Sequence, residues 1–217
     1  MTVLHVCIPN TKRDYFDYLA LPDTPAPIGA RVWVSFRNTQ KLGVVVGLGT
    51  AEDAKRKLKS ITEVIDTTPL LSDDFLKLCR WINRYYHAPL SEVLAIALPK
   101  KIRAGQIIEP KLPKINTKPP SAPLILNQEQ TVALEALGLA LNHYHAFVLH
   151  GVTGSGKTEV YLQLAARVLA NNQQVLILVP EIGLTPQLFT RFEGRFRDLI
   201  VMIHSHVSDK KRAEAWE

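Results

Sequence analysis

The sequence predicts an α/β protein with two domains: a small β-barrel-like domain that carries helices, followed by a parallel α/β domain. Three observations support this fold class. Short apolar segments that alternate with polar residues recur over residues 1–65, which is typical of a barrel or sandwich. A glycine-rich loop stands between a strand pattern and a helix pattern at residues 146–169, which is typical of a parallel α/β unit. A proline-rich stretch separates the two patterns.

The first domain is expected at residues 1–98 and begins with four strands. Gly43 and Gly47 mark bulges or tight bends in the third of them. The period of the apolar residues then changes, which predicts a helix that starts at Ser72 and a shorter one from Ser91 to Leu98. The four strands are predicted at Thr2 to Ile8, Val32 to Phe36, Leu42 to Leu48 and Ile61 to Ile65.

The stretch Tyr15-Phe16-Asp17-Tyr18 in this domain places three aromatic rings around one carboxylate. Such a group can stack a nucleobase and accept a hydrogen bond from a hydroxyl. The alternative, which residue chemistry alone favours, puts Phe16 and Tyr18 in the core and Asp17 in a turn.

Residues 99–123 hold six prolines among basic side chains and show no periodicity, so we expect a linker there. The charge is uneven along the chain. Residues 1–123 hold 18 Lys and Arg against 11 Asp and Glu, whereas residues 124–217 hold 8 against 9. This basic excess suits a polyanion-binding first half, and a merely solvated basic surface would show it equally well.

The second domain, expected at residues 124–217, carries the most specific motif of the chain. Its glycines let backbone N–H groups surround phosphate oxygens, and the helix that follows adds its positive end. Lys157 is expected to reach the β- and γ-phosphates of a nucleotide, and Thr158 to place its hydroxyl on Mg²⁺. The motif matches G-x-x-x-x-G-K-[ST] and comprises Gly151, Val152, Thr153, Gly154, Ser155, Gly156, Lys157 and Thr158.

The remaining pattern of this domain alternates strands and helices, as a parallel sheet requires. Asn127 is predicted to cap a helix with Gln130 as its capping-box partner. Glu181 follows a proline, and no apolar strand ends in Asp-Glu, so the acid that would hold Mg²⁺ and water for hydrolysis is missing. Strands are predicted at residues 146–150, 174–179 and 199–203, and helices at residues 159–169, at 188–196 and from Ser208-Asp209.

Cysteines and histidines suggest little further chemistry. Cys7 and Cys79 are too far apart in sequence for a C-x-x-C site and are expected to be buried thiols in a reducing cytosol. No signal peptide or membrane-length apolar run is found, so we expect a cytoplasmic protein without a membrane partner. A metal site is an alternative for the histidines, against which the lack of Cys or acidic companions argues; they are His143, His145, His150, His204 and His206.

Several motifs occur together in this chain: Leu126 to Gln130, residues 151–161 and Val179 to Gln187 in the second half, and Phe16-Asp17-Tyr18, Val32 to Phe36, Leu58-Lys59 and Trp81 to Tyr86 in the first. Together they resemble the PriA-type primosomal replication-restart helicases (primosomal protein N′), which are superfamily-two DNA helicases of bacteria. The resemblance covers nearly the whole chain except the linker.

The resemblance implies an ATP-dependent 3′→5′ DNA helicase that recognises stalled or branched forks and starts primosome assembly, with this chain as its N-terminal part and with an incomplete RecA-like lobe. It implies that Gln130 reads adenine, so the ligands are ATP and Mg²⁺. The implied partners are DNA forks, 3′ ends and single strands, other primosome proteins and single-stranded-DNA-binding protein, and the implied location is the nucleoid. The residues implied for a 3′ DNA end are Phe16, Asp17, Tyr18 and Lys59, and those for single-stranded DNA are Thr185, His204 and Ser205.

The chain departs from the family pattern in three places. Arg37 stands where the family usually has Gly. The linker stands where the family usually has a winged-helix module. The chain also lacks the acidic motif, the second helicase lobe and the cysteines that bind Zn²⁺ in the full-length family, so this chain alone is expected to be inactive. Two alternatives remain: a DNA-end- and nucleotide-binding module without turnover, and an unrelated P-loop ATPase, against which the glutamine motif and the basic first domain argue.

Overall fold

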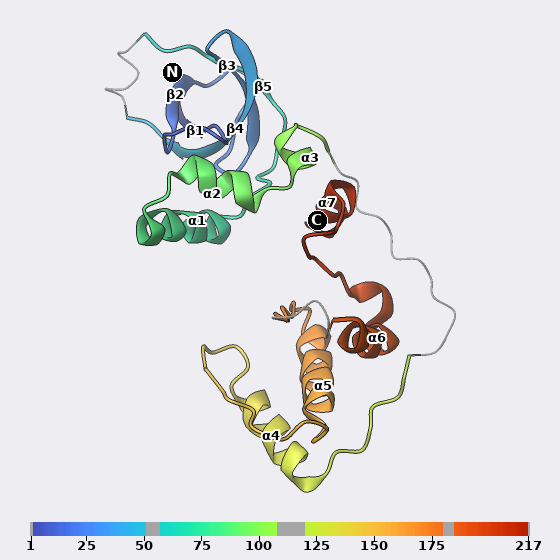
Figure 1. The fold of residues 1–217 in the computed structure, drawn as a ribbon. Coiled ribbons are helices and arrows are strands. Elements are labelled where there is room, and N and C mark those ends of the chain that lie inside the picture. Colours follow the sequence, from blue (N-terminus) through green and yellow to red (C-terminus); the bar gives the residue numbers. More distant parts are fainter. Residues whose placement is uncertain (1, 51–56, 108–119, 180–184, 217) are drawn as a thin grey trace. The chain divides into compact units, whose positions relative to one another are not determined.

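The computed structural model describes residues 2–50, 57–107, 120–179 and 185–216. The chain forms two compact units (Figure 1). One unit comprises Met1–Lys111 together with Ile203–Glu217, and the other comprises Leu112–Met202. Within the described ranges, no helix combines the length and the apolar character needed to cross a lipid bilayer.

The first unit is built on a curled antiparallel half-barrel of five strands (Figure 1). The four predicted strands are confirmed. The sequence pattern does not predict the remaining strand, β2, which places Asp17 in a strand rather than a turn. A register shift opposite Gly47 confirms the irregularity predicted there. In spatial order the strands are β2 (Phe16–Leu19), β1 (Val3–Cys7), β4 (Thr39–Leu48), β3 (Arg31–Phe36) and β5 (Ile61–Val64).

The curl brings the two edges of this sheet together. The Leu19 N–H in β2 donates to the carbonyl oxygen of Lys59 at 3.0 Å, and Leu19 also forms an isolated parallel bridge with Ser60. Lys59 and Ser60 directly precede β5, which is the opposite edge of the sheet. Residues far apart in the sheet order are therefore neighbours in space.

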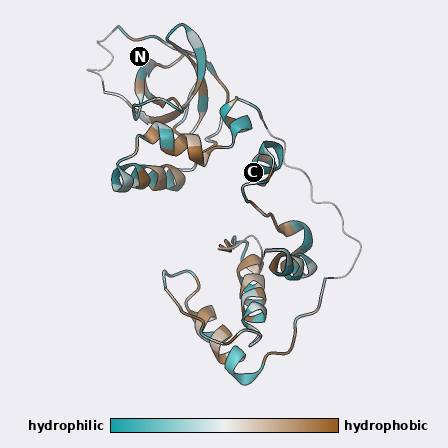
Figure 2. Cartoon of the chain, viewed as in Figure 1, coloured by the Kyte–Doolittle hydropathy of each residue, from teal (hydrophilic) through white to brown (hydrophobic). Residues whose placement is uncertain are grey.

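Both faces of the sheet are buried. Inside the curl, alternate residues of the strands form one apolar cluster that includes Val6, Val32 and Val45. On the outer face, Cys7, Val44 and other residues pack against helices α1 (Asp73–Tyr86) and α2 (Leu90–Ala97), in a second cluster. The strands and α2 accordingly show many hydrophobic residues in Figure 2. The thiols of Cys7 and Cys79 are buried in this second cluster, as predicted.

Arg31 fastens the end of the first domain to the sheet. Its side chain is buried, and its Nε and Nη2 donate to the two carboxylate oxygens of Asp66, each at 2.8 Å. Its Nη1 donates to the carbonyl oxygens of Ile102 at 3.1 Å and Gln106 at 2.8 Å. Ile102 lies in a short helix, α3 (Lys100–Arg103), and its side chain is buried. The first residues of the predicted linker are thus folded against the core.

The helix predicted from Ser208-Asp209 is confirmed as α7 (Asp209–Trp216) and belongs to this unit. Asp209 pairs with Lys100 at 3.2 Å, and Trp216 packs against the outer apolar cluster.

Strands β3 and β4 are joined by a two-residue turn. Its residues Arg37 and Asn38 have φ angles of 46° and 63°, in the left-handed region. A glycine would meet that requirement at position 37 without strain.

The second unit contains three helices among its described residues. They are α4 (Gln128–Leu139), α5 (Lys157–Ala170) and α6 (Thr185–Phe196), followed by the 3₁₀ turn η3 (Arg197–Leu199). The capping box of α4 is confirmed, because the Asn127 side chain accepts from the Gln130 N–H at 2.8 Å. Glu159 of α5 and Arg195 of α6 form an ion pair of 3.0 Å, with both side chains about nine-tenths buried.

The three predicted strands of this half are wrong for this structure. Residues 146–150, 174–179 and 200–203 contain no strand or bridge. The exposed fractions of Val175, Leu176, Ile177 and Leu178 are 42, 82, 43 and 83%, an alternation that fits an extended chain sheltered on one side. Apolar side chains favour a buried strand, but a strand forms only where neighbouring segments take up its N–H and C=O groups. The predicted RecA-like parallel lobe is therefore not confirmed.

Candidate nucleic-acid interface and nucleotide-binding loop

A hollow of about 290 Å³ lies beside the contact between the two sheet edges. The structure brings all four residues predicted for a DNA end to this hollow. Three come from β2 and the fourth from the segment before β5, so the curl of the sheet assembles the site from both edges. Its lining residues are Arg13, Tyr15, Phe16, Asp17, Tyr18, Lys57, Leu58 and Lys59.

Tyr18 forms part of the core rather than a free aromatic platform. Its side chain is 5% exposed, and its hydroxyl donates to the carbonyl oxygen of Ser35 at 3.1 Å. Burial raises the pKa of Tyr18 above its ordinary value. Phe16 is half-buried and meets the ring of Phe36 edge-on at 4.9 Å between ring centroids. The prediction that these two rings belong to the core is confirmed for Tyr18 and holds in part for Phe16.

Tyr15 and Arg13 are lining residues that the predicted site omitted. Tyr15 is 43% exposed, and its ring lies 4.1 Å from the ring of His5, which holds it in place. The Arg13 guanidinium stands 5.6 Å above the ring of Phe16, a cation–π arrangement. Tyr15 is therefore the more accessible aromatic surface of the hollow. The signal for both residues was their position within three residues before Phe16.

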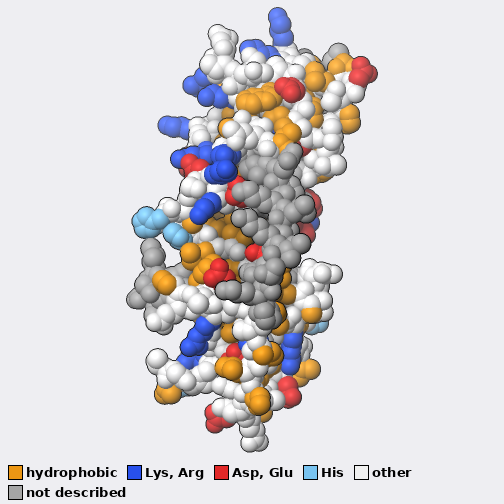
Figure 3. All heavy atoms as spheres, turned by 90° about the vertical axis from the view of Figure 1, so that its right-hand side faces the viewer, with side chains coloured by type: hydrophobic (Ala, Val, Ile, Leu, Met, Phe, Trp, Pro, Cys, Tyr) orange, Lys and Arg blue, Asp and Glu red, His pale blue; other side chains and the backbone are white. Residues whose placement is uncertain are grey.

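The charges of the hollow are unevenly shared. Arg13, Lys57 and Lys59 are exposed cations, whereas Asp17 is the single carboxylate of the lining. Asp17 lies opposite His5 in the β1–β2 register, and one of its carboxylate oxygens is shielded from solvent. Figure 3 shows further Lys and Arg side chains on the surface of the unit that contains the sheet. The hollow thus offers one precise acceptor within a positive surrounding, which suits an anionic ligand that carries a hydroxyl.

The glycine-rich loop at residues 151–158 precedes helix α5, as predicted, although no strand precedes the loop. Gly154 and Gly156 have φ angles of 84° and 82°, which side chains with a Cβ rarely adopt. Gly156 is also the N-cap of α5 and supplies no side-chain cap. The Glu159 N–H donates to the Gly156 carbonyl oxygen at 2.9 Å, and the N–H groups of Lys157 and Thr158 are placed to meet a ligand. Lys157 folds over the loop, and its Nζ donates to the carbonyl oxygens of Gly151 at 2.6 Å and Val152 at 2.9 Å.

Gln130 touches this loop. Its Oε1 accepts from the Asn127 N–H at 3.0 Å, and its Nε2 donates to the carbonyl oxygen of Ser155 at 3.0 Å. The resemblance implies that Gln130 reads adenine, with its capping geometry leaving the amide available, and the structure corrects the second expectation, since both ends of the amide are engaged. A Cβ added to Gly156 would stand 2.2 Å from Nε2, so the glycine permits this approach.

The residues predicted to touch single-stranded DNA fall in different units. Thr185 is the first residue of α6, in the second unit. His204 and Ser205 precede α7 in the first unit, where the His204 carbonyl oxygen accepts from Arg212 Nη2 at 3.0 Å. Their DNA contacts stay a prediction. Among the described residues, no group of three or more His, Cys, Asp or Glu side chains is arranged to hold a metal ion.

Two family sequence models match the chain. Residues 5–99 match the "3'DNA-binding domain (3'BD)" of PriA, and residues 123–215 match "Type III restriction enzyme, res subunit". The chain is 29% identical to replication restart protein PriA of Haemophilus influenzae, over all of this chain and 40% of that protein. It is 35% identical to PriA of Rickettsia conorii, over 90% of this chain and 29% of that protein. Identity to PriA of Bacillus subtilis is 46%, over 43% of this chain and 12% of that protein.

The chain belongs to the PriA family. It corresponds to an N-terminal portion of PriA, as its motifs implied, and it spans less than half the length of these PriA relatives. The match in Haemophilus PriA extends over 292 residues, more than the 217 of this chain, so that relative holds residues without a counterpart here. The match with the Rickettsia protein covers 197 residues, which is fewer than the 217 of this chain.

Proposed function

We propose that the first unit binds the free 3′-hydroxyl end of a DNA strand, and that the second unit contributes to the ATP-binding part of a replication-restart helicase. The observation that carries the first part is the hollow between the sheet edges, where Asp17, Tyr15 and Lys59 line one space. The match of residues 5–99 to a 3′-DNA-binding domain supports the same proposal.

The hollow fits a terminal nucleotide through three kinds of contact. A base stacked on the exposed ring of Tyr15, or beside Phe16, would gain about 1–3 kcal/mol whatever its identity. The Asp17 carboxylate would accept the terminal hydroxyl in a charged hydrogen bond worth about 1.5–3 kcal/mol. Arg13, Lys57 and Lys59 would attract the adjoining phosphate. Stacking and phosphate contacts thus provide affinity, while Asp17 provides the preference for a 3′-hydroxyl.

The test compares two oligonucleotides of the same sequence, one ending in a 3′-hydroxyl and the other in a 3′-phosphate. We expect tighter binding of the hydroxyl end, because the phosphate brings a second negative charge to Asp17. A blunt duplex, which offers no unpaired end, serves as a control for non-specific binding. Equal affinities for the two single strands would show that the chain does not recognise the 3′-hydroxyl end.

The glycine-rich loop fits the phosphates of ATP. The N–H groups at the start of α5 are donors without a side-chain cap, and Gly154 and Gly156 allow a close approach of the backbone. Lys157 would exchange its two carbonyl partners for the β- and γ-phosphates, and Thr158 would place its hydroxyl on Mg²⁺. To meet adenine, the Gln130 amide would have to exchange its present partners, the Asn127 N–H and the Ser155 carbonyl oxygen. Bound Mg²⁺ would offset the charge of the phosphates.

Two measurements separate a helicase motor from a binding module without turnover. Titration of the chain with MgATP, beside the variant Lys157→Ala, reports whether the loop binds nucleotide. Phosphate release with and without single-stranded DNA then reports turnover. We expect nucleotide binding that Lys157→Ala weakens, and no DNA-stimulated release, because no apolar segment of this sequence ends in Asp-Glu. DNA-stimulated hydrolysis by this chain would overturn the second expectation.

Fork recognition and primosome assembly belong to the same proposal. The relatives are named replication restart proteins, and a 3′ end is the feature that a halted leading strand presents at a fork. We infer that end recognition directs the chain to forks whose new strand has stopped. Binding to a fork with the 3′ end at its branch point, against a fork that lacks this strand, tests the inference.

A further inference from the structure

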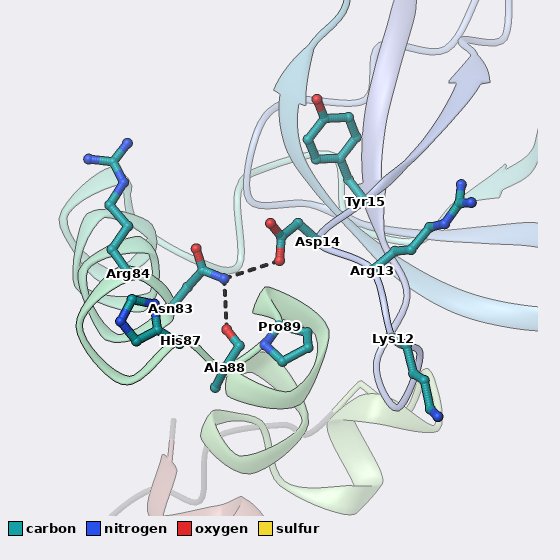
Figure 4. Close-up of a pocket in the computed structure, with 9 residues that line it drawn as sticks. All are labelled: Lys12, Arg13, Asp14, Tyr15, Asn83, Arg84, His87, Ala88 and Pro89. Atoms are coloured by element: carbon teal, nitrogen blue, oxygen red, sulfur yellow. Dashed lines mark hydrogen bonds between the residues drawn. The ribbon is translucent and has the colours of Figure 1, made fainter.

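A second hollow, of about 590 Å³, adjoins the hollow between the sheet edges. Arg13 and Tyr15 line both, so a ligand that leaves one space along these two residues enters the other. Figure 4 shows the second hollow between two walls. One wall is the segment after β1, with Lys12 and Arg13, and the other is the last turn and the end of α1, with Arg84 and His87.

Hydrogen bonds fix these walls to one another. Asn83 Nδ2 donates to Asp14 Oδ1 at 3.1 Å and to the carbonyl oxygen of Ala88 at 2.7 Å (Figure 4). The same Asp14 oxygen accepts from the Leu90 N–H at 2.8 Å, at the start of α2. The Asn83 Nδ2 and one oxygen of Asp14, the only carboxylate among the lining residues, are therefore held by hydrogen bonds.

The cations of the walls are differently placed. Lys12, Arg13 and Arg84 are exposed, and none of them takes part in an ion pair among the residues that the structure describes. The Arg13 guanidinium stands over the ring of Phe16. Three permanent cations thus line a space whose one carboxylate is hydrogen-bonded, and this excess of positive charge favours an anionic ligand.

We propose that this second hollow holds the phosphate backbone of the nucleotides that precede the 3′ end. The open, basic and polar character of the hollow suits phosphates, whereas Phe16 and Tyr18 line only the hollow between the sheet edges, which we call the end hollow. The inference rests on the proposed end recognition: with the terminal nucleotide between the sheet edges, the strand runs past Arg13 and Tyr15 and between Lys12 and Arg84.

The test measures affinity against strand length and salt for the whole chain. We compare thymidine strands of two and six nucleotides with free 3′-hydroxyls, competing with a labelled strand. The six-nucleotide strand should bind more tightly, and Arg84→Gln should weaken it about two- to fivefold, the effect of an exposed ion pair. The variant should also reduce the slope of log K against log salt by about 0.7. Lys12→Gln, on the opposite wall, should do the same.

Lys77→Gln is the matched control. Lys77 lies on the same helix but outside the hollow, paired with Asp73 at 2.8 Å, and its loss changes the net charge equally. Binding of the two-nucleotide strand and the preference for a 3′-hydroxyl over a 3′-phosphate should be unchanged in every variant. Methylphosphonate groups at the linkages before the terminal nucleotide should imitate Arg84→Gln in the unmodified protein.

The outcomes separate the two proposals. If the six-nucleotide strand binds no more tightly than the two-nucleotide strand, or if Arg84→Gln behaves like Lys77→Gln while the 3′-hydroxyl preference persists, the backbone path is wrong and end recognition stands. If Arg84→Gln weakens strands with either end equally and no end preference exists, the phosphate site stands and end recognition fails.

Discussion

Replacing Asp17 by asparagine removes one negative charge from the end hollow and keeps the size of the side chain. A charged acceptor contributes about 1.5–3 kcal/mol and a neutral one about 0.5–1.5 kcal/mol, so the 3′-hydroxyl strand should lose about 1 kcal/mol of binding. The 3′-phosphate strand should gain about 1 kcal/mol, because the repulsion of two charges near 4 Å apart in a water-filled hollow disappears. The preference for the hydroxyl end should therefore shrink by about 2 kcal/mol, or about 30-fold.

Competition titrations with the two strands measure this preference directly. Asp23→Asn is the control, because Asp23 is an exposed carboxylate in the loop after β2 and does not line the hollow. That variant should bind both strands like the unmodified chain. A preference that survives in Asp17→Asn, or that falls by the same amount in Asp23→Asn, would show that the Asp17 carboxylate does not meet the strand end.

Four further predictions concern stability and reactivity. Arg37→Gly should raise the free energy of unfolding by about 0.5–1 kcal/mol, because relief of left-handed strain exceeds the entropy cost of glycine; thermal melting beside Asn38→Gly, which should gain less, measures it. Arg31→Met should lower the free energy of unfolding by about 3–5 kcal/mol, because it leaves buried partners unpaired, and Arg31→Lys should lower it less. Urea unfolding measures both, and equal losses would contradict a bidentate contact between Arg31 and Asp66. Burial is the main reason why the pKa of the Cys7 thiol rises to about 12. Alkylation of Cys7 at pH 8 should therefore be slow until the chain unfolds, and rapid labelling of the native chain would disprove this. Burial alone would raise the pKa of Glu159, but hydrogen bonds from Gln163, Arg195 and the Leu124 N–H hold it below the ordinary value. The resulting stabilisation of the second unit is complete above the unfolded pKa of about 4.3 and disappears as pH falls through the depressed pKa, so Glu159→Gln should flatten the acid limb of the stability curve.

The elements that follow local patterns could be predicted from the sequence. Helix α1 begins at Ser72, whose side chain accepts from the Phe75 N–H at 3.2 Å, and its apolar stripe needs no distant partner to be recognised. Strand β2 has four residues, and its pairing with β1 depends on the intervening chain turning back, so the pattern at Phe16 does not reveal it. Helix α3 was not predicted, because the prolines around it indicated a linker. The buried side chain of Ile102 is the one apolar contact that this short helix makes with the core.

In the second unit, the sequence predicts strands that the structure does not contain. The apolar residues at 174–179 have the composition of a central strand, but composition does not supply the hydrogen-bonding neighbours that a strand requires. An apolar pattern therefore predicts which side chains are buried. Pairing between strands depends on contacts with distant segments, which a short stretch of sequence does not contain.

The candidate DNA-end residues came from the resemblance, since residue chemistry alone favoured a core role for Phe16 and Tyr18. The structure supports that core role for Tyr18 and also places Asp17 at a hollow. Lys57 could not have been joined to Asp17 from spacing, because the two meet only where the sheet closes on itself. For Arg13 the available hint was its place shortly before the aromatic run, from which Asp14 separates it.

The meeting of β2 with the residues before β5 has a consequence for the free protein as well. Open sheet edges invite pairing with other chains, and here each edge shields part of the other through the Leu19 and Lys59 backbones. A ligand held by Asp17 on one edge and Lys59 on the other would act as a clasp across this joint. Strand-end binding should then slow the parting of the two edges, so amide hydrogen exchange at Leu19 would report occupancy of the site from within the backbone itself.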